Sequence, residues 1–266
     1  MKHASASVQT TPVIAVVLAA GVGHRFDPDQ PKQLVTIEDK PIVVWSIEAF
    51  EQNPRVTDIL VVVSEAVHDA IGELVEANRY SKVRALLQGG KERSDSTEAA
   101  LAMLAKAGVP GNAKVLIHDS ARPFVSQEEI DGCIDALGEF TAATVACPST
   151  DTILLTGDLG DRQAVRSVPE RRHSFRAQTP QGFRFETIRK AYDLAADDPD
   201  FRPTDDTRVV VDYLPDEPVA IVAGSPSNMK VTTKDDLPMA RLIAQTVVKR
   251  REAKAKVRAI FNQALG

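Results

Sequence analysis

The sequence predicts an α/β protein with a mostly parallel sheet, helices on both faces and a protruding β-arm. Apolar runs rich in β-branched residues indicate strands that are buried on both faces. These runs alternate with helical patterns four times between residues 13 and 137, which is typical of a parallel sheet with right-handed crossovers. A polar, arginine-rich stretch then interrupts the alternation. We therefore expect a Rossmann-like sheet.

The first strand is expected at residues 13–19, where Val13-Ile-Ala-Val-Val-Leu-Ala19 is apolar throughout. The first helix is expected at 41–52, because Pro41 suits a first helical turn and apolar residues recur on one face. The same patterns place strands at 59–63, 83–87 and 114–118, and helices at 65–78, 94–106 and 128–137.

The second half of the chain departs from this pattern. A strand is expected at 144–147, but residues 148–178 are polar and lack helical periodicity. So long a stretch inside a compact domain often marks a functional excursion or an oligomer contact, and we interpret it as a β-arm. Helices at 185–195 and 205–213, a strand at 219–223 and a closing helix from residue 235 complete the prediction.

These elements account for one domain at residues 13–245, with the arm at about 148–178. Residues 1–12 lack a hydrophobic pattern, so we expect a disordered tail. Residues 246–266 are expected to form a basic helical extension, since residues 249–258 carry six basic side chains and one acid on a helical pattern. We interpret this extension as a solvated helix face rather than a membrane-surface helix, because it is poor in aromatic residues.

Composition excludes several classes of protein. The chain has 266 residues, and its 32 Lys+Arg against 37 Asp+Glu give a net charge of −5, which argues against a nucleic-acid binder. No apolar run approaches the roughly 20 residues of a membrane-spanning helix, and the first apolar run is too short for a signal peptide. Its two cysteines, Cys133 and Cys147, form neither a disulfide framework nor a zinc motif. These features predict a cytoplasmic protein.

A glycine-rich loop follows the first strand. Gly21 and Gly23 allow backbone N–H groups to approach a phosphate closely. The loop is not a dinucleotide fingerprint, because Phe26 takes the place of the third glycine, and no P-loop lysine follows. Arg25 and Lys32 would let it clamp a triphosphate. The simpler interpretation is a glycine turn with two surface cations.

Further polar residues follow the third and fourth strands. The glycine pair ending at Gly90 would let main-chain groups reach a planar base, and Ser96 would add a hydroxyl, although an ordinary turn capped by Ser94 is the simpler interpretation. Asp119 ends the fourth strand, where it could hold ribose hydroxyls or a magnesium ion, while His118 is expected to pack rather than act as a base.

Two more cations complete the pattern. Arg122 could bind a phosphate, and Lys230 follows a late strand. Ligands bind at the carboxyl ends of the strands in such sheets, so these groups are expected to share one crevice. Together they indicate nucleotidyl transfer, because positioning and charge neutralisation supply most of that chemistry.

The motifs resemble those of a known family. In order they are Leu18-Ala-Ala-Gly-x-Gly-x-Arg25, Pro31-Lys32, Gly89-Gly-x-Glu-Arg-x-Asp-Ser96, His118-Asp-x-Ala-Arg-Pro123, Asp151-Thr152, Gln178-Thr-Pro-Gln181, Thr204-Asp205 and Lys230-Val-Thr-Thr233. The set is similar to that of the 2-C-methyl-D-erythritol 4-phosphate cytidylyltransferases of the non-mevalonate isoprenoid route, over about residues 13–245. The resemblance implies a sheet of the nucleotidyltransferase type.

The resemblance also implies a reaction and a site. CTP and 2-C-methyl-D-erythritol 4-phosphate would give 4-diphosphocytidyl-2-C-methyl-D-erythritol and pyrophosphate, with Mg²⁺ held mainly by the CTP phosphates and Asp119 as its one protein ligand. The family forms homodimers that exchange the arm, so Arg171 would reach the partner's substrate. The implied catalytic residues are Arg25, Lys32 and Lys230; the nucleotide-binding residues Ala19, Ala20, Gly21, Gly23, Gly90, Ser96 and Asp119; and the substrate-binding residues Arg122, Thr152, Arg171, Thr179 and Thr204.

Three alternatives remain open at the level of sequence. A ribitol-5-phosphate cytidylyltransferase differs only in its phosphorylated polyol, and the pattern separates the two enzymes poorly. The His118-Asp motif and the short arm argue against a hexose-1-phosphate nucleotidyltransferase. An inactive nucleotide-binding regulator would keep the fold, but the intact Arg25, Lys32 and Lys230 argue against it.

Overall fold

A seven-stranded sheet forms the centre of the computed structural model, which describes residues 11–265 apart from 22, 24–25, 28–29 and 201–202. Residues 1–10 of the tail predicted at 1–12 therefore lie outside the described residues. The strands lie in the order β11 (Val219–Ala223), β7 (Ala142–Pro148), β10 (Phe175–Arg184), β6 (Lys114–Asp119), β1 (Val13–Ala19), β4 (Asp58–Val63) and β5 (Val83–Gln88).

The strand pairings confirm the mostly parallel sheet. Strand β1 pairs in parallel with β4 and β6, β4 with β5, and β7 with β11. The predicted strand at the start of the chain is buried along its whole length, as its unbroken apolar run requires. Its side chains alternate between two cores, with Ala15 and Val17 in one and Ile14 and Val16 in the other.

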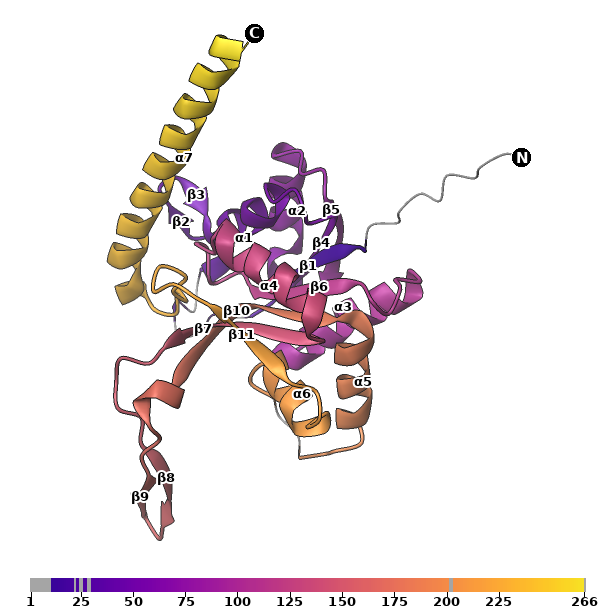
Figure 1. Ribbon diagram of the computed structural model, residues 1–266, viewed down its shortest axis with the longest axis vertical. Helices are drawn as coiled ribbons and strands as arrows, with labels where there is room; N and C mark the ends of the chain where they lie inside the picture. Colours follow the sequence, from indigo (N-terminus) through magenta and orange to yellow (C-terminus); the bar gives the residue numbers. More distant parts are fainter. Residues whose placement is uncertain (1–10, 22, 24–25, 28–29, 201–202, 266) are drawn as a thin grey trace, which may run out of the picture.

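Helices cover both faces of the sheet (Figure 1). One core holds side chains from α1 (Ile42–Glu51), α2 (His68–Ala77) and α4 (Gln127–Glu139). The opposite core holds side chains from α3 (Arg93–Lys106), α5 (Phe185–Ala195) and α6 (Asp206–Tyr213). The predicted helix at 65–78 is a 3₁₀ turn, η2 (Glu65–Val67), that leads into α2.

The prediction was wrong about where the arm ends. Residues 175–178 belong to β10, which lies antiparallel between β6 and β7, with Arg176 opposite Cys147. The strand escaped prediction because its centre, Gln178-Thr-Pro-Gln181, carries polar residues and a proline that break the alternation of a strand. A register shift between Ala177 and Gln181 accommodates this segment, and Gln178 Nε2 donates to Ser225 O over 2.8 Å.

A separate hairpin extends from the sheet within the predicted arm. Strands β8 (Leu155–Leu159) and β9 (Arg162–Ser167) pair only with each other among the described strands. Figure 1 shows this hairpin reaching away from the central layers. The short 3₁₀ turn η3 (Arg171–His173) then leads into β10.

The C-terminal helix α7 (Leu237–Leu265) follows the 3₁₀ turn η4 (Lys234–Asp236) and runs past the predicted domain end at residue 245. Ala240 and Ala244 are buried against Trp45 and the unpredicted hairpin of β2 (Thr36–Ile37) and β3 (Lys40–Pro41). Farther along, Val257 and Phe261 are exposed, and Figure 1 shows the end of the helix projecting from the body. The predicted helical extension is confirmed through residue 265.

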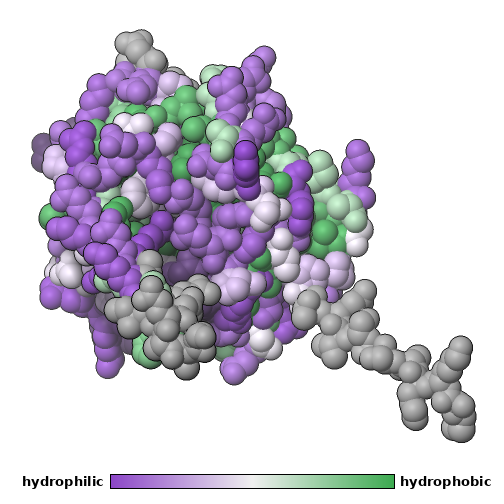
Figure 2. Space-filling view, turned by 90° about the horizontal axis from the view of Figure 1, so that it is seen from above, coloured by the Kyte–Doolittle hydropathy of each residue, from purple (hydrophilic) through white to green (hydrophobic). Residues whose placement is uncertain are grey.

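The surface is largely hydrophilic where Figure 2 shows it, with apolar residues in scattered patches around a central hollow. Among the described residues, no helix is both long enough and apolar enough to cross a membrane. Cys133 and Cys147 are free thiols, and both are buried.

Candidate active site

A cavity of about 370 Å³ opens where β1, β5 and β6 end. This is the edge of the sheet at which a parallel α/β fold binds its ligands. The walls come from four stretches of the chain that are far apart in sequence. The lining residues are Leu18, Ala20, Gly21, Gly23, Lys32, Gln33, Gly90, Lys91, Glu92, Arg93, Ser96, Asp119, Ser120, Ala121, Lys230 and Thr232.

The loop after β1 forms one wall. Gly23 has φ +68°, a left-handed conformation that favours glycine. Gln33 anchors the loop, because its Nε2 donates to the Ala19 carbonyl over 2.6 Å and to that of Gly21. Lys32 begins the 3₁₀ turn η1 (Lys32–Leu34) and faces the cavity. The other predicted cation of this loop, Arg25, lies outside the described residues.

The turn after β5 forms the opposite wall. A Cβ on Gly89 would lie 2.5 Å from Ala20 Cβ and 2.6 Å from Ser96 Oγ, so this close approach requires glycine. Helix α3 begins with Glu92 as its N-cap, in a capping box with Asp95. The suggested Ser94 cap was therefore wrong. Ser96 is buried on the first turn and lines the cavity beside Gly90.

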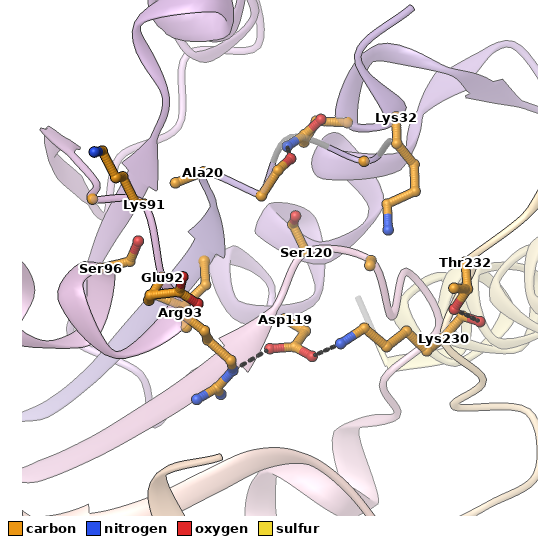
Figure 3. Close-up of a pocket in the computed structure, with 16 residues that line it drawn as sticks. Ala20, Lys32, Lys91, Glu92, Arg93, Ser96, Asp119, Ser120, Lys230 and Thr232 are labelled. Carbon is orange, nitrogen blue, oxygen red and sulfur yellow. Dashed lines mark hydrogen bonds and ion pairs between the residues drawn. The ribbon is translucent and has the colours of Figure 1, made fainter. Parts of the chain in front are cut away.

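Asp119 lies at the centre of the site between two cations (Figure 3). Its Oδ1 accepts from Arg93 Nε over 3.1 Å, and its Oδ2 accepts from Lys230 Nζ over 2.7 Å. Burial acts to raise the pKa of this carboxyl, but the charges of Arg93 and Lys230 outweigh it and hold the pKa far below its usual range. Asp119 is therefore a carboxylate at any working pH.

Lys32 and Lys230 approach the same space from different elements. Lys32 follows β1, and Lys230 lies in the segment that connects β11 to η4. Figure 3 shows both side chains extending toward the space beside Asp119. Two positive charges at one cavity favour an anionic ligand. The predicted convergence of cations is confirmed for these two residues.

Arg93 is a site residue for which the sequence suggested no role. Besides contacting Asp119, its Nη1 donates to Asp206 Oδ2 over 2.6 Å. Asp206 is completely buried at the start of α6, and its Oδ1 accepts from Tyr192 Oη over 2.6 Å. The only signal in the sequence is the arginine within Gly-Gly-x-Glu-Arg. Its partner Asp206 is 113 residues away, so no local pattern reveals the pair.

His118 packs beneath the site, as predicted. It is fully buried, and its ring meets Phe50 edge to face at 5.2 Å. Its Nε2 lies 3.0 Å from the Arg122 carbonyl, so Nε2 carries the proton, and Nδ1 accepts from Thr179 Oγ1 over 2.9 Å. Thr179 Oγ1 in turn accepts from the Asp119 N–H over 3.2 Å. Burial lowers the pKa of His118 to about 4, so the imidazole is neutral.

The predicted substrate-binding residues occupy two places. Arg122 lies beside the cavity, with Nη1 donating to the Asn228 carbonyl over 2.9 Å, and Thr204 precedes Asp205, the N-cap of α6. At the base of the hairpin, Arg171 Nη2 donates to Thr152 Oγ1 over 3.3 Å. Neither residue lines the cavity of its own chain. The buried hydroxyl of Thr179 bonds internally, and its contact with substrate stays a prediction.

The donor set does not form a metal site by itself. The described residues contain no group of three His, Cys, Asp or Glu side chains placed to hold an ion. Asp119, the predicted ligand, already engages both carboxylate oxygens with cations. A magnesium ion here would therefore need most of its oxygen ligands from a bound triphosphate.

Residues 13–246 match the family model of 2-C-methyl-D-erythritol 4-phosphate cytidylyltransferase (IspD). The chain belongs to this family. A cytidylyltransferase of that name from Bifidobacterium longum (strain DJO10A) is 63% identical over 97% of this chain and 90% of the relative. The one from Thermobifida fusca (strain YX) is 42% identical over 89% of this chain and 94% of the relative.

Other comparisons agree with the cytidylyltransferase family. The solved structure of 4-diphosphocytidyl-2C-methyl-D-erythritol synthase from Anaerococcus prevotii superposes with a TM-score of 0.75 at 26% identity, covering 88% of this chain and 96% of that one. The bifunctional ribulose 5-phosphate reductase/CDP-ribitol pyrophosphorylase Bcs1 of Haemophilus influenzae is 36% identical over 88% of this chain but only 48% of the relative. Bcs1 is thus a more distant match than the two cytidylyltransferases named above.

Proposed function

We propose that this protein transfers a cytidylyl group from CTP to 2-C-methyl-D-erythritol 4-phosphate, a step of isoprenoid precursor synthesis. Family membership gives the reaction. The observation in the structure that carries it is the approach of Lys32 and Lys230, from separate parts of the chain, to one cavity that also holds Asp119. Such an arrangement suits a reaction in which one phosphate attacks another.

The reaction needs charge neutralisation more than proton transfer. A phosphate oxygen of the sugar phosphate attacks the α-phosphorus of CTP, and the bond from that phosphorus to the pyrophosphate oxygen breaks. A phosphate monoester has its second pKa near about 6, so it is already a nucleophile at neutral pH. His118 is buried and both of its ring nitrogens contact protein groups, in keeping with a site that requires no base. Fixed positive charges then supply most of the catalysis.

Each wall of the cavity has a proposed role. The loop from Ala19 to Gly23 and the turn at Gly90 and Ser96 would hold the cytosine and the phosphates. Asp119 would accept hydrogen bonds from the ribose hydroxyls. Lys32 and Lys230 would stabilise the negative charge that develops on the α-phosphate, together with Arg25. Arg122, next to the lining residue Ala121, and Thr204, before the N-cap of α6, would bind the sugar phosphate.

We propose Mg²⁺ as the cofactor, carried mainly by the triphosphate. The donor set supports this arrangement, because the two carboxylates among the described lining residues are already engaged: Asp119 contacts two cations, and Glu92 caps α3. When bound, the ion would neutralise part of the phosphate charge. The orientation of the two substrates remains the work of the protein's own side chains.

The hairpin supports a homodimer. An isolated two-stranded hairpin is at best marginally stable in water, and contiguous exposed apolar residues mark interaction surfaces. A second copy of the chain would cover these residues and receive Arg171 and Thr152 next to its cavity. The exposed apolar residues in and around the hairpin are Ile153, Leu154, Leu155, Leu159, Val165, Val168 and Phe175.

Complementation between subunits tests the exchange of the arm. Lys32→Ala disables the cavity of its own subunit, and Arg171→Ala disables the arm of its own subunit. When the two inactive variants are mixed and allowed to exchange subunits, a mixed dimer holds one site with both residues intact if the arm serves the partner. Activity then returns in the mixture. If the arm serves its own chain, no activity returns.

The cellular setting that we propose is the cytoplasm. Cys133 and Cys147 are buried free thiols, and burial raises the pKa of Cys133 to about 12, so it is an inert thiol. Free thiols of this kind suit a reducing compartment.

Pyrophosphate release tests the proposed function directly. The purified protein is incubated with Mg²⁺ and CTP, ATP, GTP or UTP, with and without 2-C-methyl-D-erythritol 4-phosphate. We expect release only with CTP and the sugar phosphate together. Ribitol 5-phosphate serves as the competing substrate, and a higher kcat/KM with it would assign the protein to the ribitol reaction. Absence of release with every combination would support the inactive regulator.

A further inference from the structure

A chain of polar contacts runs from Lys230, which lines the cavity, to α5. It passes through Asp119, Arg93 and Asp206 and ends at Tyr192. The contacts measure 2.7 Å, 3.1 Å, 2.6 Å and 2.6 Å in that order. Figure 3 shows its first part, with Arg93 and Lys230 on opposite sides of Asp119.

Asp206 is the fixed end of this chain. Its side chain is fully buried, and both carboxylate oxygens are engaged, one by Tyr192 Oη and the other by Arg93 Nη1. Its backbone N–H donates to Gln181 Oε1 over 2.9 Å. Two contacts therefore hold the carboxylate and a third holds the backbone of the same residue, so Asp206 is a fixed partner for Arg93.

Stability alone does not explain the cluster. Burying charged groups costs free energy, and a buried ion pair is often no more stable than well-packed apolar residues in its place. The guanidinium is also incompletely satisfied, since Arg93 Nη2 is buried without a hydrogen-bond partner among the described residues. Groups of this kind are retained where they orient others at a functional site.

The chain joins two parts of the proposed active site. Asp119, at one end, would receive the ribose. Asp206 is the first residue of α6 and follows Thr204 by two positions, on the side proposed for the sugar phosphate. Arg93 is the side chain that bridges them: its planar fork presents Nε to one carboxylate and Nη1 to the other, whereas a lysine offers a single point charge.

We propose that Arg93 and Asp206 are positioning residues: they hold the Asp119 carboxylate in the orientation that receives the ribose hydroxyls, and they tie it to the start of α6. The inference rests on the proposed function for the identity of the nucleotide. It adds a role for two residues that act through Asp119 rather than by touching the reacting atoms.

Equilibrium binding of CTP and 2′-deoxy-CTP tests this role without any turnover. Titration calorimetry with Mg²⁺ gives the ratio of the two dissociation constants. We expect the wild type to bind CTP at least about 10-fold more tightly than the deoxynucleotide, since the 2′-hydroxyl would donate to a charged carboxylate and hydrogen bonds to charged groups are the stronger ones. In Arg93→Lys the preference falls to within about twofold of unity, because the charge remains but the bridge is lost.

A double-mutant cycle with Asp119→Asn separates positioning from general stabilisation. If Arg93 acts through Asp119, Arg93→Lys changes the ratio of dissociation constants little once Asp119 is already altered.

Tyr192→Phe removes one contact to Asp206 and offers a milder variant if Arg93→Lys fails to fold. We expect it to lower the preference about two- to fivefold. Arg84→Lys, in the exposed pair of Arg84 with Asp58, is the matched control and should leave the ratio unchanged.

Three results would overturn the positioning role. In the first, the wild type binds both nucleotides equally. In the second, Arg93→Lys lowers the affinity for CTP and for 2′-deoxy-CTP by the same factor. In the third, the effects of Arg93→Lys and Asp119→Asn on the ratio of dissociation constants are additive. A protein that prefers CTP through this cluster but releases no pyrophosphate with the sugar phosphate would instead overturn the proposed function. The two failures are thus distinguishable.

Discussion

Nζ of Lys230 lies 2.7 Å from Oδ2 of Asp119, although 111 residues separate them in the chain. The contact joins the end of β6 to the segment after β11. In the proposed site this one carboxylate has two roles, because it would receive the ribose and it contacts a cation that would face the phosphates. A change at Asp119 is expected to disturb both functions together.

Lys32→Ala should reduce turnover about 10²–10³-fold, the usual effect of removing one contact that stabilises charge in a transition state. CTP affinity should fall much less, since Lys230 still faces the cavity. Pyrophosphate release gives kcat, and titration calorimetry gives the dissociation constant of CTP. Lys190→Ala, on the exposed face of α5, is the control and should match the wild type. Near-normal turnover of Lys32→Ala would exclude Lys32 from catalysis.

The sequence was sufficient to predict the cavity walls, because the residues concerned follow apolar strands directly. Gly23 and Gly90 follow predicted strands closely, and Asp119 ends one. Parallel strands bring their carboxyl ends to one edge, so local patterns were enough to place these residues together.

The remaining features depend on long-range packing. Strand β10 carries Gln178 and Gln181 in its centre, and their amides bond to Ser225 and Asp206, which the local pattern cannot reveal. The pairing of Arg93 with Asp206 likewise forms only after α3 and α6 pack on the same face of the sheet. These tertiary contacts satisfy buried polar groups, and they produce no periodic pattern in the sequence.

Gly89→Ala should raise KM for CTP at least about 10-fold. The added methyl would lie 2.5 Å from Ala20 Cβ and 2.6 Å from Ser96 Oγ, so both cavity walls must shift, and such overpacking costs about 1–3 kcal/mol. Steady-state kinetics and the thermal midpoint measure the two effects. Gly138→Ala, where no atom lies within 4 Å of the new methyl, is the matched control. An unchanged KM in Gly89→Ala would remove this turn from the nucleotide site.

His118 should make the protein less stable in mild acid. Burial lowers the pKa of its imidazole to about 4, against about 6.5 in an unfolded chain. As pH falls from about 6.5 to 4, His118 becomes protonated in the unfolded chain but stays neutral in the native state. The free energy of unfolding therefore declines by roughly 3 kcal/mol. Below about 4 both states are protonated, and this loss levels off.

Urea unfolding between pH 4 and 7.5 measures that decline. His118→Gln keeps a hydrogen-bonding side chain but no titrating ring, so its free energy of unfolding should be flatter over this range. Subtracting the two curves removes the contribution of the carboxylates that both proteins share. Parallel curves would show that His118 is protonated equally in both states.

Leu159→Lys combined with Val165→Lys should dissociate the proposed dimer. Both side chains are more than half exposed on the hairpin, at 69% and 55%, and a second copy would bury them beside its cavity, where unpaired charge is costly. Sedimentation velocity should show the wild type at twice the mass of the 28.8 kDa chain and the variant at the mass of one chain.

Turnover should fall with dissociation if the arm delivers Arg171 to the partner. Leu194→Lys, an exposed apolar position on α5, is the control and should remain dimeric. A dimeric, fully active double variant would mean that the hairpin's apolar surface serves some other contact.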